Sequence, residues 1–200
     1  MSTQDIRVVK LGGSLLDLPD LAARLRRWLG ARPARPSAII VGGGRLVDAV
    51  RQYDRLHALG DETAHWLAVQ AMQVQARMVA TLLPEATWAE SVERLIAVAP
   101  PLSIVDPWEL LRDDDRRLSP QPLPAGWQVT SDSIAARLAQ LCGAAELVLL
   151  KSALPAEATL TAAASSGYVD AFFPRAATLP CVRCVNLRDE YFSEIRLTLS

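Results

Sequence analysis

The sequence contains two glycine-rich turns, each placed directly after a short apolar run. The run Gly12-Gly13-Ser14 follows residues 6–11, and the run Gly42-Gly43-Gly44 follows residues 38–41. Glycine has no Cβ atom, so the backbone N–H groups of such a turn can approach an anion, and a helix that begins there adds the positive end of its dipole. Either turn alone is more simply a tight connection. Two of them after successive strands favour adjacent phosphate-binding turns, which is a donor–acceptor arrangement for phosphoryl transfer.

Two lysines lie at the ends of apolar runs. Lys10 precedes the first glycine turn, and Lys151 follows residues 147–150. An ammonium group at either place can stabilise the charge that spreads over a transferred phosphoryl group, although Lys10 could instead point to solvent from an edge strand. Between the lysines, Asp132 opens a predicted helix. It is either a first-turn acid favoured by the helix dipole or the residue that orients both lysines.

The elements that must position these residues alternate between strands and helices. Strands are expected at residues 6–11, 38–41, 95–98, 102–105, 127–129, 146–150, 182–187 and 195–199, the last two as an antiparallel pair. Helices are expected at residues 21–29, 46–53, 62–83, 107–111 and 131–141. Apolar strands alternating with amphipathic helices are typical of a parallel sheet covered on both faces. The sequence therefore predicts an α/β fold, in one domain of residues 1–200, around a mainly parallel sheet.

Two further segments carry specific expectations. On the long predicted helix, Leu67, Ala71, Val74 and Met78 recur at helical spacing and are expected to form its inner stripe, although the same stripe could equally serve as an interface. Residues 112–124 are charged and rich in proline, which is typical of a surface loop.

The composition excludes several classes of function. Half of the 200 residues are hydrophobic and 21 basic residues nearly balance 22 acidic ones, so composition gives no argument for a nucleic-acid or membrane-surface partner. The first ten residues lack a signal-peptide pattern and no apolar run approaches about 18 residues, so a cytoplasmic protein is expected. Neither glycine turn fits the Walker or dinucleotide fingerprints. Cys181 and Cys184 lack a second cysteine pair, and His57 and His65 lack further ligands, so no metal site is expected.

Four segments together resemble the amino acid kinase family, which includes acetylglutamate, aspartate and bacterial uridylate kinases. They are Val9-Lys10-Leu11-Gly12-Gly13-Ser14, Ile40-Val41-Gly42-Gly43-Gly44, Thr130-Ser131-Asp132-Ser133-Ile134-Ala135 and Leu149-Leu150-Lys151-Ser152. The resemblance implies a three-layer α/β/α sandwich, ATP with Mg²⁺ as the phosphoryl donor, in-line transfer to a small-molecule acceptor, and a homo-oligomer.

The same resemblance implies roles for individual residues. It assigns transition-state stabilisation to Lys10 and Lys151, and the organisation of these lysines to Asp132. It assigns phosphate or nucleotide binding to Gly12, Gly13, Ser14, Gly43, Gly44 and Ser131. It also implies an acceptor- and phosphate-side lobe of about residues 1–125 and a shortened nucleotide-side lobe of about residues 126–200.

Within the family, residues 54–66 and 167–174 resemble the small kinases of methanofuran biosynthesis, a route to a C1 cofactor. Those enzymes phosphorylate [5-(aminomethyl)furan-3-yl]methyl phosphate to its diphosphate. This resemblance implies that Gly42, Asp54, His57, Asp61 and His65 lie near the acceptor, with an acid available for its ammonium group, although these positions could equally be polar residues on a helix surface. The alternatives are a uridylate-type nucleoside monophosphate kinase and a non-catalytic nucleotide- or anion-binding protein of the same fold.

Overall fold

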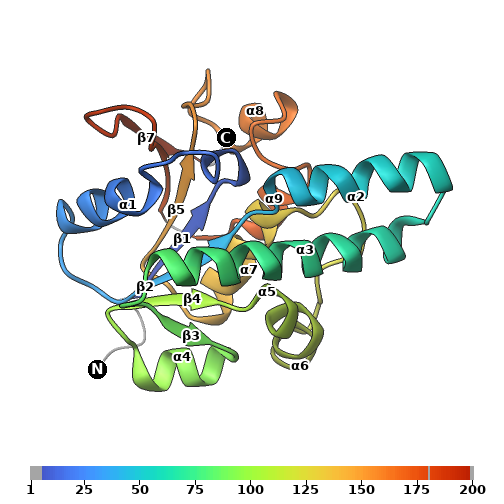
Figure 1. Ribbon diagram of the computed structural model, residues 1–200, viewed down its shortest axis with the longest axis horizontal. Helices are drawn as coiled ribbons and strands as arrows, with labels where there is room; N and C mark the ends of the chain where they lie inside the picture. The colour runs from blue at the N-terminus through green and yellow to red at the C-terminus, as the bar shows by residue number, and fades with distance from the viewer. Residues whose placement is uncertain (1–5, 180, 199–200) are drawn as a thin grey trace.

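The computed structural model describes residues 6–179 and 181–198, and these residues build one seven-stranded sheet (Figure 1). The strands are β1 (Arg7–Leu11), β2 (Ser37–Val41), β3 (Thr87–Ala89), β4 (Leu102–Val105), β5 (Glu146–Lys151), β6 (Val182–Asn186) and β7 (Glu194–Leu197). Their order is β3-β4-β2-β1-β5-β6-β7, and every neighbouring pair is parallel except the antiparallel pair of β6 and β7. The predicted α/β fold around a mainly parallel sheet is confirmed. The sheet runs without a break through the two predicted lobes, whose separate roles stay a prediction.

Helices cover both faces of the sheet, which explains why its central strands are apolar throughout. On one face, α1 (Leu21–Gly30) buries Leu21, Leu25 and Trp28 against one side of β1, β2 and β5. On the opposite face, α7 (Ser131–Leu141) packs against the other side of the same strands. Successive strand residues point to opposite faces, so the β1 residues Val8 and Lys10 point towards α7.

The remaining helices are short, apart from one long pair. The short elements are η2 (Gly13–Leu15), α4 (Val92–Val98), α5 (Pro107–Glu109), the π-helical turn η3 (Leu110–Asp114), α6 (Asp115–Leu118), α8 (Leu160–Ser165) and α9 (Phe173–Ala176). The long pair is α2 (Gly44–His57) and α3 (Asp61–Leu82), which run antiparallel and project together beyond the sheet (Figure 1). Among the described residues, no helix combines the length and the apolar character needed to cross a membrane.

Three local predictions are wrong. Residues 95–98 belong to α4, whose start is fixed by the Ser91 hydroxyl accepting from Arg94 N at 3.3 Å, and the strand lies upstream as β3. Residues 127–129 form a turn and no strand. Residues 112–124 are not simply a surface loop, because they contain most of η3 and all of α6 and bury two acids. Asp114 accepts from Val92 N at 2.7 Å, and Asp115 lies 3.2 Å from Arg137.

The expected inner stripe of α3 is also wrong. Leu67, Val74 and Met78 are 39%, 58% and 38% exposed. The buried face of α3 consists of Ala64, His65, Ala68, Val69, Met72, Gln75, Ala76 and Val79. The buried face combines small alanines with the apolar Val69, Met72 and Val79, so fit to the neighbouring elements decides which apolar side of the helix is buried. The stripe therefore does not belong to the hydrophobic core, and its role as an interface stays a prediction.

Candidate active site

The two glycine turns meet at one edge of the sheet. β1 and β2 are adjacent and parallel, so the turns that follow them lie side by side. Gly12 N donates to Leu150 O and Gly42 N donates to Leu11 O, each at 2.8 Å. A Cβ atom added to Gly13 would lie only 2.2 Å from Gly44 N, so the two turns touch through bare backbone. The turns at residues 12–14 and 42–44 are therefore direct neighbours, as the sequence predicts.

Only the second turn opens a long helix, which corrects the expectation that both do. Gly13 begins η2, three residues of 3₁₀ helix, whereas Gly44 begins the 14 residues of α2. Gly44 has φ +49°, a left-handed conformation that favours glycine. The Gly43 carbonyl accepts from Gln75 Nε2 at 3.3 Å, which ties the turn to α3. The helix-dipole argument therefore applies to the second turn alone.

Lys10, Asp132 and Lys151 form a buried ionic cluster behind these turns. Lys10 pairs in register with Leu149, two residues before Lys151, so both lysines point to the α7 face of the sheet. The Nζ atoms of Lys10 and Lys151 lie 3.0 Å from Asp132 Oδ1 and Oδ2, respectively. The side chains of Lys10 and Asp132 are each 7% exposed and that of Lys151 is 14% exposed. This position on a central strand excludes the alternative in which Lys10 points to solvent from an edge.

The cluster carries one surplus positive charge away from water. Burial would raise the pKa of Asp132, but the charges and hydrogen bonds of Lys10 and Lys151 outweigh it, and the pKa lies below its ordinary value. Burial lowers the pKa of the Lys151 ammonium, and repulsion by Lys10 adds to the effect, while Asp132 opposes it. Two cations share one carboxylate, so an incoming anion would complete the charge balance. The charge of the cluster therefore favours an anion.

These two lysines are the only lysines in the chain, against 19 arginines. Lysine presents a compact ammonium that can lie against a carboxylate and a phosphoryl oxygen in a narrow space, whereas arginine presents a wide planar fork. Every other basic residue except the two histidines is an arginine, so the use of lysine at positions 10 and 151 indicates that both positions require an ammonium group. This signal is present in the sequence and was not used in the predictions above.

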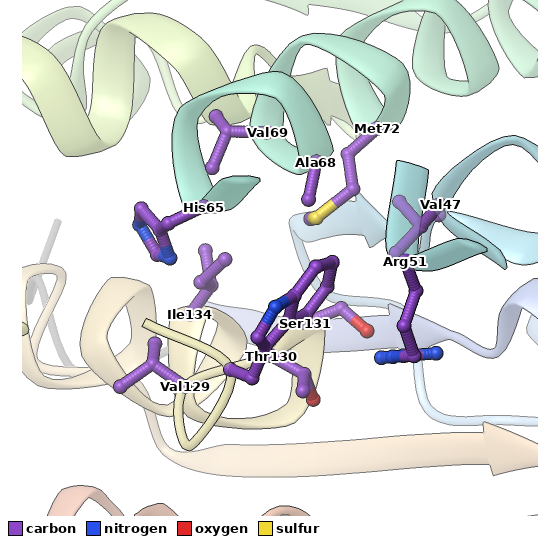
Figure 2. Close-up of a pocket in the computed structure, with 12 residues that line it drawn as sticks. Val47, Arg51, His65, Ala68, Val69, Met72, Val129, Thr130, Ser131 and Ile134 are labelled. Carbon is purple, nitrogen blue, oxygen red and sulfur yellow. The ribbon is translucent and has the colours of Figure 1, made fainter. Parts of the chain in front are cut away.

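A cleft opens beside the second glycine turn, between α2, α3 and the start of α7 (Figure 2). Its empty volume, including the open mouth, is about 400 Å³. The apolar part of its wall consists of Val47, Ala68, Val69, Met72, Val129 and Ile134. The polar lining is Arg51, His65, Thr130 and Ser131, with the indole of Trp127 beside them. No Asp or Glu is among the lining residues, which include Arg51 as a permanently charged side chain.

Arg51 and His65 give the cleft its polar character. The Arg51 guanidinium lies 4.6 Å from the centre of the Trp127 ring and 3.1 Å from Asp48 Oδ1. His65 is buried, and burial lowers the pKa of its imidazole although the Gly126 carbonyl opposes this. Arg51 was not among the predicted site residues. It lies seven positions after Gly44, on the same helical face as Gly44 and Val47, and that spacing could have identified it.

The predicted acceptor residues divide into two groups. Gly42 lies at the turn, and an added Cβ there would meet the Ser131 hydroxyl at 3.1 Å. His65 lines the cleft, and Asp54 accepts from the indole Nε1 of the cleft residue Trp127 at 2.7 Å. The exposed His57 and Asp61 are the last residue of α2 and the first of α3, at the far end of the helical pair. Neither residue lines the cleft, although Asp61 lies one helical turn before His65 and His57 lies three residues after Asp54.

Two neighbouring groups complete the site. The Tyr168 carbonyl accepts a hydrogen bond from Lys151 Nζ, which lies 4.5 Å from the centre of the Tyr168 ring. The hydroxyls of Ser14 and Ser152 lie 2.5 Å apart across the ends of β1 and β5, and Arg188 donates to Ser14 O at 2.8 Å. In the described part of the chain, no group of three His, Cys, Asp or Glu residues is arranged to hold a metal ion.

A model of the amino acid kinase family matches residues 5–153. The chain belongs to the amino acid kinase family. As a member, it is a phosphotransferase of the amino acid kinase type. No curated protein matches the sequence.

Solved structures extend the likeness of this amino acid kinase over almost the whole fold. UMP kinase from Ureaplasma parvum superposes with a TM-score of 0.65 at 12% identity, covering 93% of this chain and 91% of that one. UMP kinase from Bacillus anthracis gives a TM-score of 0.63 at 12% identity, covering 93% and 88%. Uridylate kinase from Archaeoglobus fulgidus gives 0.52 at 16% identity, covering 75% and 64%. At such identities the likeness establishes the fold alone.

Proposed function

We propose that this amino acid kinase transfers the γ-phosphoryl group of ATP to a small phosphorylated metabolite. The observation that carries the proposal is the buried Lys10–Asp132–Lys151 cluster, which holds a surplus positive charge at the sheet edge where the two glycine turns touch. Charge in phosphoryl transfer spreads over the equatorial oxygens of the transferred group, so catalysis is mainly positioning and electrostatic stabilisation.

Each part of the site then has a chemical task. Lys10 and Lys151 donate hydrogen bonds to the transferred group, and Asp132 holds the two ammonium groups at a fixed separation. The turn at Gly12 and Gly13 receives the donor phosphates beside Ser14, and the turn at Gly43 and Gly44, close to Ser131, receives the acceptor. When Mg²⁺ is bound with ATP, it neutralises phosphate charge. Asp132 is already paired with both lysines, so the phosphates themselves would be the principal ligands of that ion.

For the acceptor, the best candidate is [5-(aminomethyl)furan-3-yl]methyl phosphate, converted to its diphosphate in methanofuran-type cofactor biosynthesis. A phosphate fits beside Arg51, and a flat ring fits the apolar wall. No acid lines the cleft itself, so an ammonium group on the ring would have to reach Asp54 beside Trp127. His57 and Asp61 do not line the cleft, so their substrate-side role rests on the resemblance alone.

The test is a panel of acceptors incubated with Mg·ATP and the purified protein. The panel contains the furanmethyl phosphate, UMP, acetylglutamate and carbamate, and product formation is followed by ³¹P NMR. Turnover of the furanmethyl phosphate supports the full proposal, whereas turnover of UMP alone would replace the acceptor and keep the kinase. The matched control is Lys10→Ala, which removes one ammonium group and leaves Asp132 paired with Lys151. A protein that binds no nucleotide in calorimetry and turns over none of the four acceptors would contradict the proposal and favour a non-catalytic binding protein.

A further inference from the structure

The loop after α8 contacts the active site through a carboxylate to which no role has been assigned. Asp170 lies between Val169 and Phe173, which are 3% and 0% exposed and anchor the loop in the core on either side. Its Oδ2 atom accepts from Thr130 N at 3.0 Å, from the Thr130 hydroxyl at 2.8 Å and from Ser133 N at 3.0 Å. Its Oδ1 atom accepts from the Ser133 hydroxyl and from Phe172 N.

These contacts replace the ordinary cap of α7. The first N–H groups of a helix have no partner within the helix, and a nearby side chain usually accepts from the second or third of them. Thr130 occupies the N-cap position of α7 but makes no side-chain cap hydrogen bond, because its hydroxyl donates to Asp170 instead. The first turn of α7 is therefore held from a loop about 40 residues away in sequence.

The residues that Asp170 holds flank the centre of the ionic cluster. Thr130 and Ser133 lie on either side of Ser131 and Asp132, so their attachment fixes where the Asp132 carboxylate stands. The same loop also fixes the other end of one ion pair, because the carbonyl of Tyr168 accepts from Lys151 Nζ. One short segment thus fixes both members of the Lys151–Asp132 pair.

We infer that Asp170 is a positioning residue for phosphoryl transfer, holding the first turn of α7 so that Asp132 meets Lys10 and Lys151 together. The inference rests on the proposed kinase function and adds a residue to it. Without this carboxylate, the α7 start would lose a charged acceptor for two backbone N–H groups, and Asp132 would no longer be fixed between the lysines. The loss would lower turnover and would also loosen the part of the cleft wall that contains Thr130 and Ser131, whereas the two glycine turns stay in place.

The experiment compares Asp170→Ala and Asp170→Asn with a control, Asp114→Asn. Asp114 also caps a helix from a distance, through Val92 N of α4, and it makes no contact with the ionic cluster. The kinetic readout uses Mg·ATP with whichever acceptor the wild-type protein turns over. We expect Asp170→Ala to lower kcat by roughly 30- to 100-fold with the KM for ATP changed less than threefold. Asp170→Asn keeps one acceptor oxygen, so it should recover part of that loss, and Asp114→Asn should keep kcat within twofold.

A second readout does not depend on turnover. Because the chain has only two lysines, protein labelled with ¹³Cε-lysine gives two side-chain signals whose pH titration can be followed separately. In Asp170→Ala the Lys151 signal should titrate at lower pH than in the wild type, because the attraction of Asp132 is weakened, and Asp114→Asn should leave the Lys151 titration unchanged.

The outcomes distinguish a failure of the role of Asp170 from a failure of the kinase function. If Asp170→Ala folds, turns over like Asp114→Asn and keeps the wild-type lysine titrations, the inference is overturned while the kinase function stands. If Asp170→Ala does not fold, Asp170→Asn decides by the same two measurements. If the wild-type protein turns over no acceptor, the kinase function fails, and the lysine titrations alone decide whether Asp170 positions the cluster.

Discussion

Replacing Gly13 by alanine tests whether the two glycine turns touch. The added Cβ would lie 2.2 Å from Gly44 N and 2.6 Å from Gly44 Cα, whereas ordinary van der Waals contacts begin near 3.4 Å. The two turns must therefore separate by about 1 Å, and both contact surfaces are backbone, which cannot rotate away as a side chain can. Overpacking costs about 1–3 kcal/mol in typical cores, and the rigidity of this contact places the expected loss near the upper end of that range.

A loss of about 3 kcal/mol corresponds to a Tm lowered by roughly 6–12 °C for a domain of this size. Displacement of a phosphate-binding turn by about 1 Å should also cost on the order of 100-fold in kcat/KM. Differential scanning calorimetry measures the first effect and steady-state kinetics with Mg·ATP the second. The control is Gly30→Ala, at the end of α1, where an added Cβ meets nothing within 4 Å. It should leave Tm unchanged or slightly higher, because alanine favours a helix.

The contact between Gly13 and Gly44 would be refuted if Gly13→Ala melts within 2 °C of Gly30→Ala and retains wild-type kcat/KM. In that case the turns would not be in contact, and a shared edge for donor and acceptor phosphates would lose its structural basis.

Four further predictions address the ionic cluster, the cleft and the exposed helix face. Lys10→Ala should lower kcat by roughly 10²–10³-fold in the ³¹P assay while Tm changes little, because Asp132 keeps one ion pair; an unchanged rate would count against the assignment. The pKa of Lys151 is lowered, so its ammonium loses its proton at a lower pH than an ordinary lysine does. As pH rises, kcat/KM should therefore begin to decrease before pH 10.5 is reached. A kcat/KM that stays constant up to pH 10.5 would contradict the role of the Lys151 ammonium. Arg51→Gln should raise KM for a phosphorylated acceptor about tenfold and leave KM for ATP unchanged; equal effects on both would contradict its place in the acceptor cleft. Val74→Glu, on the exposed stripe of α3, should convert a homo-oligomer to monomers in light scattering, and a wild-type protein that is already monomeric would refute the oligomer.

The central sheet and the lysine positions could be predicted from the sequence because their signals are local. The apolar runs at β1, β2 and β5 are long enough to identify buried parallel strands, and the glycine turns and lysines stand directly at their ends. Adjacent parallel strands then bring those ends together. The side of the sheet on which the lysines meet Asp132 also follows from the two-residue period of a strand.

The parts that could not be predicted depend on contacts between distant segments. The buried face of α3 is chosen by how closely Ala68 and Ala76 fit the elements beneath them, although apolar residues are present on several sides of the helix. The cap of α7 comes from Asp170, and no spacing rule links it to Thr130. His57 and Asp61 appear close to the second glycine turn in sequence, but the straight course of α2 carries them away from it.

The insertion of β1 between β2 and β5 has a consequence for how the protein is made. β1 leaves the ribosome before β5, which is translated about 135 residues later. At about 5–20 residues per second, the nascent chain carries an unpaired apolar β1 edge for on the order of ten seconds. During that time the edge can pair with other chains, so a chaperone that shields short β-branched segments would raise the yield of soluble protein.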